Sequence, residues 1–247
     1  MFRWTVSESI IGNSPALGVR PGQTWELIDS SMINFNKDVK KSTKENVGWG
    51  EWANRSREFL EPYHTSTLGK ECAAGDKAPT FGNDFCKFIP DKKSPCFSGN
   101  YGYNQGKPCV FIKLNKIYGL VPDYHNDTSA LPKEVPAEAA ERIEKAGNKN
   151  QVWIDCHGEQ PADIESMGPI TYYPSDAGFD SSYFPYLNQN GYLSPLIAVQ
   201  FENPAVGQLL HIECRAYAKN IGYHKRDKIG RAHFEILVRD SNQIEIN

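Results

Sequence analysis

Three short stretches of the chain place histidines beside carboxylates, the side chains that most often carry out general acid–base catalysis. Their residues are Asp155, His157, Glu159, His211, Glu213, His233 and Glu235. Because alternate residues of a strand share a face, we expect His211 and Glu213, and likewise His233 and Glu235, to lie on a solvated outer face. No HExxH, GxSxG or P-loop motif accompanies them.

His157 and Glu159 follow a predicted strand and are expected on a loop, where an acid–base pair could act. A hydrolase built around His157 is therefore one alternative. Its test is that replacing both residues abolishes a turnover. No nucleophile or metal ligand can be named beside them, so we expect no catalytic residue, no metal and no cofactor.

Six cysteines are the second group with a possible chemistry: Cys72, Cys86, Cys96, Cys109, Cys156 and Cys214. They include no CxxC pair, and no histidine stands at zinc-finger spacing, so a zinc site is not expected. Many pairings are possible. The order favours sequential pairing, of Cys72 with Cys86, Cys96 with Cys109 and Cys156 with Cys214. Such disulfides would need an oxidising compartment.

Two glycan acceptor sequons, at Asn54 and Asn126, agree with that compartment, whereas Pro204 disqualifies Asn203. The chain has no apolar stretch of signal-peptide length and none of the roughly 20 residues that span a membrane. We therefore expect an exported fragment whose targeting or anchoring segment precedes Met1.

Length and charge set limits on the class of protein. A chain of 247 residues can bury one good core. The net charge of −3 gives no basic footprint, so nucleic acid is not an expected partner. Residues 1–30 show little periodicity and several prolines and glycines, which is typical of a stalk or strap. Residues 31–247 are expected to form the domain.

The elements that must position these residues are mainly strands. Strand patterns cover residues 30–36, 108–115, 151–156, 170–174, 195–201, 209–218 and 232–238. One helix is predicted over residues 49–63, ended by Pro62, and another begins at Pro136 and ends near Gly147.

Two strands carry an inward-facing cysteine. Cys156 shares a face with Ile154, and Cys214 shares one with Ile212. With Trp153 nearby, the pair is expected to bridge the two sheets of a sandwich. The predicted fold is mainly β, an immunoglobulin-like β-sandwich with one or two peripheral helices and three disulfides.

A stretch between residues 171 and 196 holds many aromatic side chains among prolines and glycines: Tyr172, Tyr173, Phe179, Tyr183, Phe184, Tyr186 and Tyr192. Two interpretations stay open. The stretch is an irregular segment packed against the sandwich, or it is a protein-binding surface, since Tyr and Phe are frequent at binding hot spots.

Three motifs resemble one family. "YGYNQGKPCVFIKLN", "YFPYLNQNGYLSPLIAVQF" and "IECRAYAKNIGY" are similar to segments of the β subunits of the sodium/potassium-transporting ATPase and of its proton/potassium relative, in the same order. "KNIGY" resembles the sodium/potassium branch more closely. The resemblance spans nearly the whole chain and also implies three sequential disulfides.

The resemblance implies a plasma-membrane glycoprotein with one membrane helix, residues 1–30 near the membrane and the rest outside the cell. It implies no catalysis in this chain, because ATP hydrolysis and ion transport belong to the α subunit. The β subunit would help the α subunit to fold, reach the plasma membrane and be tuned. A small membrane regulatory subunit is a further possible partner.

The resemblance also implies an interface with an extracellular loop of the α subunit. The residues carried over to this role are Tyr183, Phe184, Pro185, Tyr186, Tyr192, Leu193, Pro195, Leu196, Val199 and Phe201. The alternative from another class is a cell-adhesion module that uses the same sandwich. Dependence of surface delivery on an α chain would favour the subunit role, and self-association through an exposed edge strand would favour adhesion.

Overall fold

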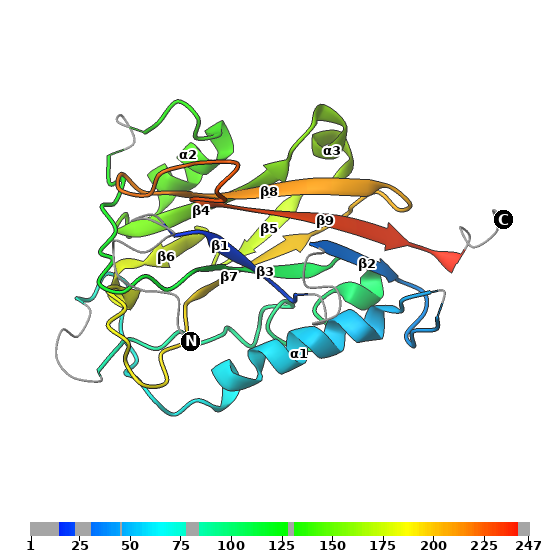
Figure 1. The fold of residues 1–247 in the computed structure, drawn as a ribbon, viewed down its shortest axis with the longest axis horizontal. Coiled ribbons are helices and arrows are strands. Elements are labelled where there is room, and N and C mark those ends of the chain that lie inside the picture. Colours follow the sequence, from blue (N-terminus) through cyan, green and yellow to red (C-terminus); the bar gives the residue numbers. More distant parts are fainter. Residues whose placement is uncertain (1–14, 23–30, 45, 78–83, 128–130, 242–247) are drawn as a thin grey trace.

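The computed structural model describes residues 15–22, 31–44, 46–77, 84–127 and 131–241, and these form a two-layer β-sandwich (Figure 1). The first sheet has the strand order β1 (Leu17–Arg20), β3 (Cys109–Leu114), β7 (Leu196–Phe201), β5 (Ile170–Tyr173). The second has the order β2 (Met32–Asn36), β9 (Arg231–Arg239), β8 (Leu209–Tyr217), β4 (Gln151–Gly158), β6 (Gly178–Asp180). Neighbouring strands are antiparallel except β2 and β9, which are parallel. The mainly β fold is confirmed.

The core lies between the two sheets. On β8 the alternate residues Leu210, Ile212 and Cys214 point into it and are fully buried. Phe201 of the first sheet meets Phe234 of the second, with ring centroids 6.2 Å apart. The alternation predicted for β8 is therefore the pattern of a strand with one face in the core.

Helix α1 (Trp49–Thr65) covers the outer face of the first sheet (Figure 1). The ring centroid of Phe111 on β3 lies 5.8 Å from that of Phe59 on α1 and 5.6 Å from that of Phe97. Phe111 is therefore as buried as its neighbours Val110 and Ile112. A strand covered on both faces loses its alternation of polar and apolar side chains.

The prediction that Pro62 ends this helix is wrong, because α1 continues to Thr65 with Pro62 inside it. A proline removes one N–H and crowds the preceding turn, which is costly in a helix interior. Near the end of a helix this cost in stability is smaller. The Pro62 carbonyl still accepts a hydrogen bond from the Ser66 amide at 3.0 Å, which closes the last turn.

Two further helices lie against the second sheet. Helix α2 (Ala137–Lys145), which the sequence predicted, packs Ile143 against Trp153 and Tyr217 on the outer face. Helix α3 (Pro161–Ser166) was not predicted and contacts β4 and β8. Single 3₁₀ turns are η2 (Tyr103–Gln105), inside the loop closed by Cys96 and Cys109, and η4 (Ser181–Tyr183).

All six cysteines are paired, and the pairs are the sequential ones: Cys72–Cys86, Cys96–Cys109 and Cys156–Cys214. The expected bridge between the two sheets is wrong. Cys156 on β4 stands directly opposite Cys214 on β8, with their Cα atoms 4.0 Å apart, so this disulfide joins neighbouring strands of one sheet. Inward-facing cysteines on adjacent strands meet each other before they can reach the opposite layer.

The predicted stalk, residues 1–30, lies mostly outside the described residues. Its described part includes β1, which pairs with β3 from Leu17 opposite Leu114 to Arg20 opposite Phe111. This short stretch is therefore an edge strand of the first sheet. Among the described residues, no helix is long and apolar enough to cross a membrane.

Candidate partner-binding surface

The aromatic segment, residues 183–195, runs from η4 to the start of β7 at the end of the molecule where α1 ends (Figure 1, yellow). Its rings form one cluster. The ring centroid of Tyr192 lies 5.1 Å from that of Tyr186 and 5.5 Å from that of Phe85. The ring centroids of Tyr183 and Phe88 are 6.2 Å apart. An irregular segment with few backbone ladder bonds is held here by ring packing.

Side-chain hydrogen bonds to the backbone fix this segment further. The Tyr192 hydroxyl donates to the carbonyl of Tyr183 at 3.0 Å, and the Tyr63 hydroxyl donates to the carbonyl of Ser194 at 2.9 Å. Burial raises the pKa of Tyr63 and of Tyr192, so both hydroxyls stay protonated as donors.

A lysine joins the cluster. The Lys116 ammonium donates to the carbonyl of Tyr192 at 2.7 Å and lies 5.1 and 5.2 Å from the ring centroids of Tyr186 and Tyr192. Burial lowers the pKa of Lys116. A cation over two tyrosine faces is a stabilising contact of roughly 1 kcal/mol each when partly desolvated.

The ten residues predicted to contact a partner divide into two groups by burial. Six have buried side chains: Phe184, Tyr192, Pro195, Leu196, Val199 and Phe201. Four are partly exposed: Tyr183, Pro185, Tyr186 and Leu193. In this structure the six buried side chains belong to the fold of the chain itself. The interface stays a prediction, and its outward-facing part is the group of four.

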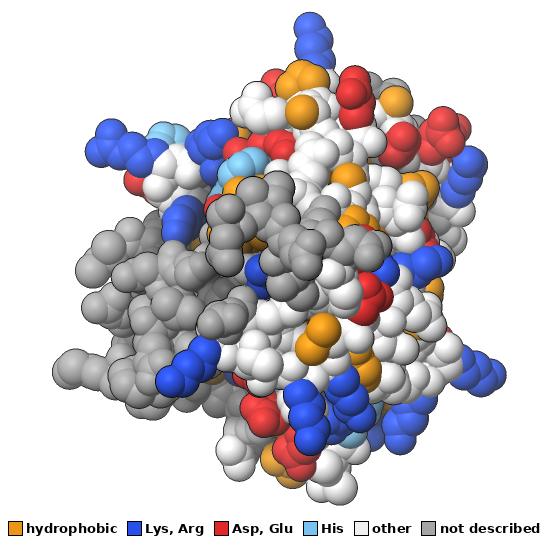
Figure 2. Space-filling view, turned by 90° about the vertical axis from the view of Figure 1, so that its right-hand side faces the viewer, with side chains coloured by type: hydrophobic (Ala, Val, Ile, Leu, Met, Phe, Trp, Pro, Cys, Tyr) orange, Lys and Arg blue, Asp and Glu red, His pale blue; other side chains and the backbone are white. Residues whose placement is uncertain are grey.

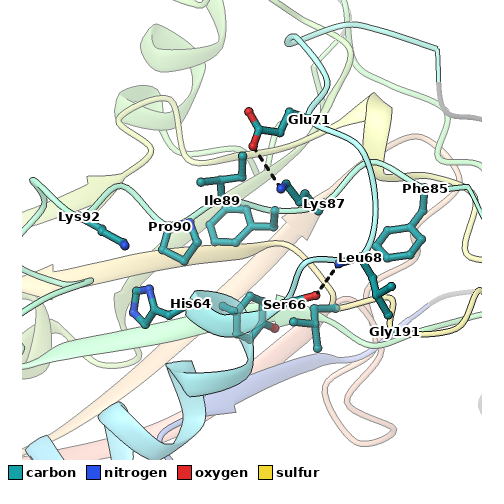
Figure 3. A pocket seen from close by; sticks show the side chains of 13 residues that line it. His64, Ser66, Leu68, Glu71, Phe85, Lys87, Ile89, Pro90, Lys92 and Gly191 are labelled. Atoms are coloured by element: carbon teal, nitrogen blue, oxygen red, sulfur yellow. Dashed lines mark hydrogen bonds and ion pairs between the residues drawn. The ribbon is translucent and has the colours of Figure 1, made fainter.

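A cavity of about 150 Å³ lies beside this segment (Figure 3). Leu193 and Gly191 line it together with Leu68 and Ile89, whose exposed fractions are 47% and 53%. A Glu71–Lys87 ion pair of 3.1 Å lies on its rim. Exposed aliphatic side chains around a hollow are typical of a protein contact site.

Sequence analysis did not identify Leu68 and Ile89, because both lie in loops without a period that would assign their side chains to a face. Figure 2 shows the opposite end of the molecule, where hydrophobic side chains are scattered among charged side chains of both signs. Within that view they form no continuous patch.

The two sequons lie in different surroundings. Asn126 is exposed in an irregular loop, which is the usual setting of a modified asparagine. Asn54 is exposed in the middle of α1, but the hydroxyl-bearing Ser56 of the same sequon is fully buried. Glycosylation of both sites stays a prediction.

His211, Glu213, His233 and Glu235 lie on the predicted outer face, but they are not all solvated. Glu213 is only 2% exposed, so that expectation was wrong. The connection between β8 and β9 folds over it, and the Tyr223 hydroxyl donates to its carboxylate at 3.2 Å. Arg231, also buried, bonds Glu213 and donates to Glu159 at 2.7 Å.

Residues 155–159, which were considered as a catalytic acid–base site, are held in ion pairs. His157 was predicted on a loop, which is wrong, because it lies in β4. His157 contacts Asp155 at 3.4 Å, and Asp155 accepts from Arg142 at 2.8 Å. Glu159 points toward Arg231 and His233. His157 and Glu159 therefore do not face each other as an acid–base pair.

Comparisons with known proteins agree with the motifs. The family model for the sodium/potassium ATPase beta chain matches residues 3–234. The chain is similar to two Drosophila melanogaster proteins, sodium/potassium-transporting ATPase subunit beta-2 at 36% identity and subunit beta-1 at 40%, each over 96% of this chain and 74% of the relative. A Caenorhabditis briggsae protein described as probable sodium/potassium-transporting ATPase subunit beta-3 is 31% identical over 96% of this chain and 69% of the relative. The chain belongs to the sodium/potassium ATPase beta chain family.

Proposed function

We propose that this chain is the extracellular domain of a non-catalytic β subunit that binds the catalytic α subunit of a sodium/potassium-transporting ATPase. It serves the folding, plasma-membrane delivery and tuning of that subunit. Family membership over nearly the whole chain is the observation that carries this proposal. Three disulfides support it, because they need the oxidising side of a membrane.

The proposed contact with the α subunit is the partly exposed part of the aromatic segment together with its aliphatic neighbours. Tyr186 and Leu193 supply the outward-facing part of the segment, and Leu68 and Ile89 extend it around the cavity. The backbone of Tyr118 forms an isolated β-bridge with that of Tyr186, and the Tyr118 side chain is 45% exposed. Aromatic and aliphatic side chains at the centre of an interface commonly supply most of the binding energy.

The test is co-purification of the full natural chain with a sodium/potassium ATPase α subunit from detergent-solubilised plasma membranes. Ile89→Asp places a charge in the proposed contact. Ile164→Asp is the matched control, because Ile164 has the same type and nearly the same exposed fraction, 56% against 53%, but lies on α3 away from the segment. Ile89→Asp should weaken association at least about tenfold, roughly 1.4 kcal/mol, and the control should not.

Three outcomes are informative. Recovery of the α subunit near one to one, reduced only by Ile89→Asp, supports both the function and the surface. Recovery that neither variant reduces keeps the function and removes the surface. Retention of only a second copy or another surface protein by the unaltered chain would contradict the subunit role and favour adhesion.

A further inference from the structure

Three side chains with metal-binding atoms meet on the outer face of the second sheet. His211 on β8 stands directly opposite Glu235 on β9, and His233 lies two residues before Glu235 on the same face. One ligand atom from each of the three lies within 4.8 Å of the other two. The imidazole rings are stacked, with centroids 6.0 Å apart. All three side chains are half-buried and reachable from solvent.

Neighbouring residues orient these groups. Nδ1 of His233 is 2.6 Å from a Glu159 carboxylate oxygen, and Glu159 is held by Arg231 at 2.7 Å. The Ser31 hydroxyl donates to Oε2 of Glu235 at 2.6 Å. Bonds of this kind fix the tautomer and direction of a histidine and the free oxygen of a carboxylate, as around metal ligands in proteins.

The remaining atoms then face one another. Nε2 of His233 is 2.8 Å from Oε1 of Glu235, and the His211 ring stacks on that of His233. Two ligand atoms on one tetrahedral zinc ion lie roughly 3.3 Å apart, given zinc–nitrogen and zinc–oxygen distances of about 2.0–2.1 Å. The pair needs to separate by only about 0.5 Å, and the His211 ligand atom, which lies within 4.8 Å of both, needs to approach by at most about 1.5 Å.

We propose that His211, His233 and Glu235 form a binding site for zinc or a similar divalent transition-metal ion. Two imidazole nitrogens and one carboxylate oxygen suit zinc, with water in the fourth position. Calcium and magnesium prefer about six or more oxygen ligands, so neither ion is expected at this site. The ion would lie between Nε2 of His233 and Oε1 of Glu235, which contact each other directly in this structure.

The ion would link β8 to β9. Through the hydrogen bond from Ser31 to Glu235, it would also link them to the start of β2. These strands lie side by side in the second sheet, whereas the aromatic segment lies at one end of the molecule (Figure 1). The site is therefore separate from the proposed α-subunit contact. It does not depend on the proposed function.

The experiment is calorimetric titration of the intact, chelator-treated chain with zinc chloride. We expect one ion per chain and no binding of magnesium chloride. His211→Gln should weaken zinc binding at least about 100-fold, because it removes one of the three ligands. The fold should tolerate it, because among the described residues the His211 ring makes no hydrogen bond, whereas its backbone N–H donates to Asp163. Glu159→Gln should weaken it about 10- to 100-fold by releasing His233.

His224→Ala is the matched control. It removes another histidine that contacts a carboxylate, Asp227 at 3.0 Å, but on an exposed loop away from the three ligands. Circular dichroism confirms that each variant is folded. The proposal is overturned if the unaltered chain binds no zinc at about 100 μM, or if folded His211→Gln binds it as tightly as the His224→Ala control.

Discussion

Removing the disulfide between β4 and β8 should cost more stability than removing either of the other two. Cys156 and Cys214 are 58 residues apart in the sequence, whereas the pair Cys72–Cys86 is 14 apart and Cys96–Cys109 is 13 apart. A cross-link lowers the entropy of the unfolded chain more when it closes a longer loop. The longest loop here is closed at the middle of the second sheet.

The magnitude follows from loop length. With the chain-entropy relation, closing the longest loop contributes roughly 4 kcal/mol at 25 °C, and each short loop contributes roughly 3 kcal/mol. Alanine is the replacement of choice, because a serine at the fully buried Cys214 position would place a hydroxyl without a partner in the core. Lost sulfur packing adds to the cost for both buried pairs, Cys156–Cys214 and Cys96–Cys109, and adds less for the partly exposed Cys72, so the difference from Cys72–Cys86 should be at least about 1 kcal/mol.

The assay is equilibrium unfolding in urea, followed by circular dichroism and tryptophan fluorescence. The double variant Cys156→Ala/Cys214→Ala is compared with Cys72→Ala/Cys86→Ala as the matched control. Both should shift the urea midpoint downward, the first by more. If the control loses as much free energy of unfolding as the β4–β8 variant, loop length does not govern these disulfides and the reasoning is refuted.

Two further predictions concern charges inside the fold. Arg231→Met should lower the free energy of unfolding by about 3–5 kcal/mol, because it leaves the buried Glu213 carboxylate with less compensation; a loss below about 1 kcal/mol in urea unfolding would contradict this. Burial, with Arg20 and Lys116 nearby, lowers the pKa of Lys113 from 10.5 to about 8. The native state therefore binds fewer protons than the unfolded state between these two values, and its stability rises with pH there. Lys113→Met should therefore raise the free energy of unfolding by up to roughly 3 kcal/mol at pH 7, and this gain should vanish near pH 10.5. Melting temperatures of variant and parent that run parallel from pH 6 to 10.5 would refute this prediction.

The long strands could be predicted from the sequence because one of their faces is in the core. In β8, Leu210, Ile212 and Cys214 alternate with polar residues, and this pattern fixes both the element and its inward face. Strands β1 (Leu17–Arg20) and β6 (Gly178–Asp180) were not predicted. Three residues of β6 are too few for a period of two to be recognised. The four residues of β1 include Gly18, whereas the equally short β5 consists of β-branched and aromatic residues, which favour strands.

Periodicity identifies a face but not a partner strand. It placed Cys156 and Cys214 inward correctly, yet the same alternation fits a bridge across the core and a bridge between neighbours. Only the register, which sets Cys156 opposite Cys214, decides between them. Periodicity also failed to predict the burial of Glu213, because the connection between β8 and β9 covers the outer face of the sheet at this residue. No local pattern of the strand itself records what a distant loop covers.

The aromatic segment was the least predictable part, because an irregular segment has no period that separates buried from exposed side chains. The structure confirms the first interpretation, a segment packed against the sandwich, for part of it, and the second, a protein-binding surface, stays a prediction. Tyr192 and Phe184 pack into the fold, while Tyr186 and Leu193 stay partly exposed. The metal-binding residues could be placed on one face by alternation. Their closeness depends on the pairing of His211 with Glu235, which the sequence does not state.

The buried aromatics can serve partner binding without touching a partner. Tyr63 and Tyr192 each donate a hydroxyl to the backbone of the aromatic segment, and Lys116 holds a third point at the Tyr192 carbonyl. A segment without a ladder of strand hydrogen bonds would otherwise lose conformational entropy on binding, at a cost of roughly 1 kcal/mol or more per ordered residue. Because the chain's own core orders the segment in advance, its few exposed side chains would meet the proposed partner in a fixed arrangement. Weakening this inner set, for instance by replacing the buried Tyr192 with Phe, would then reduce affinity without removing an exposed atom of the proposed contact surface.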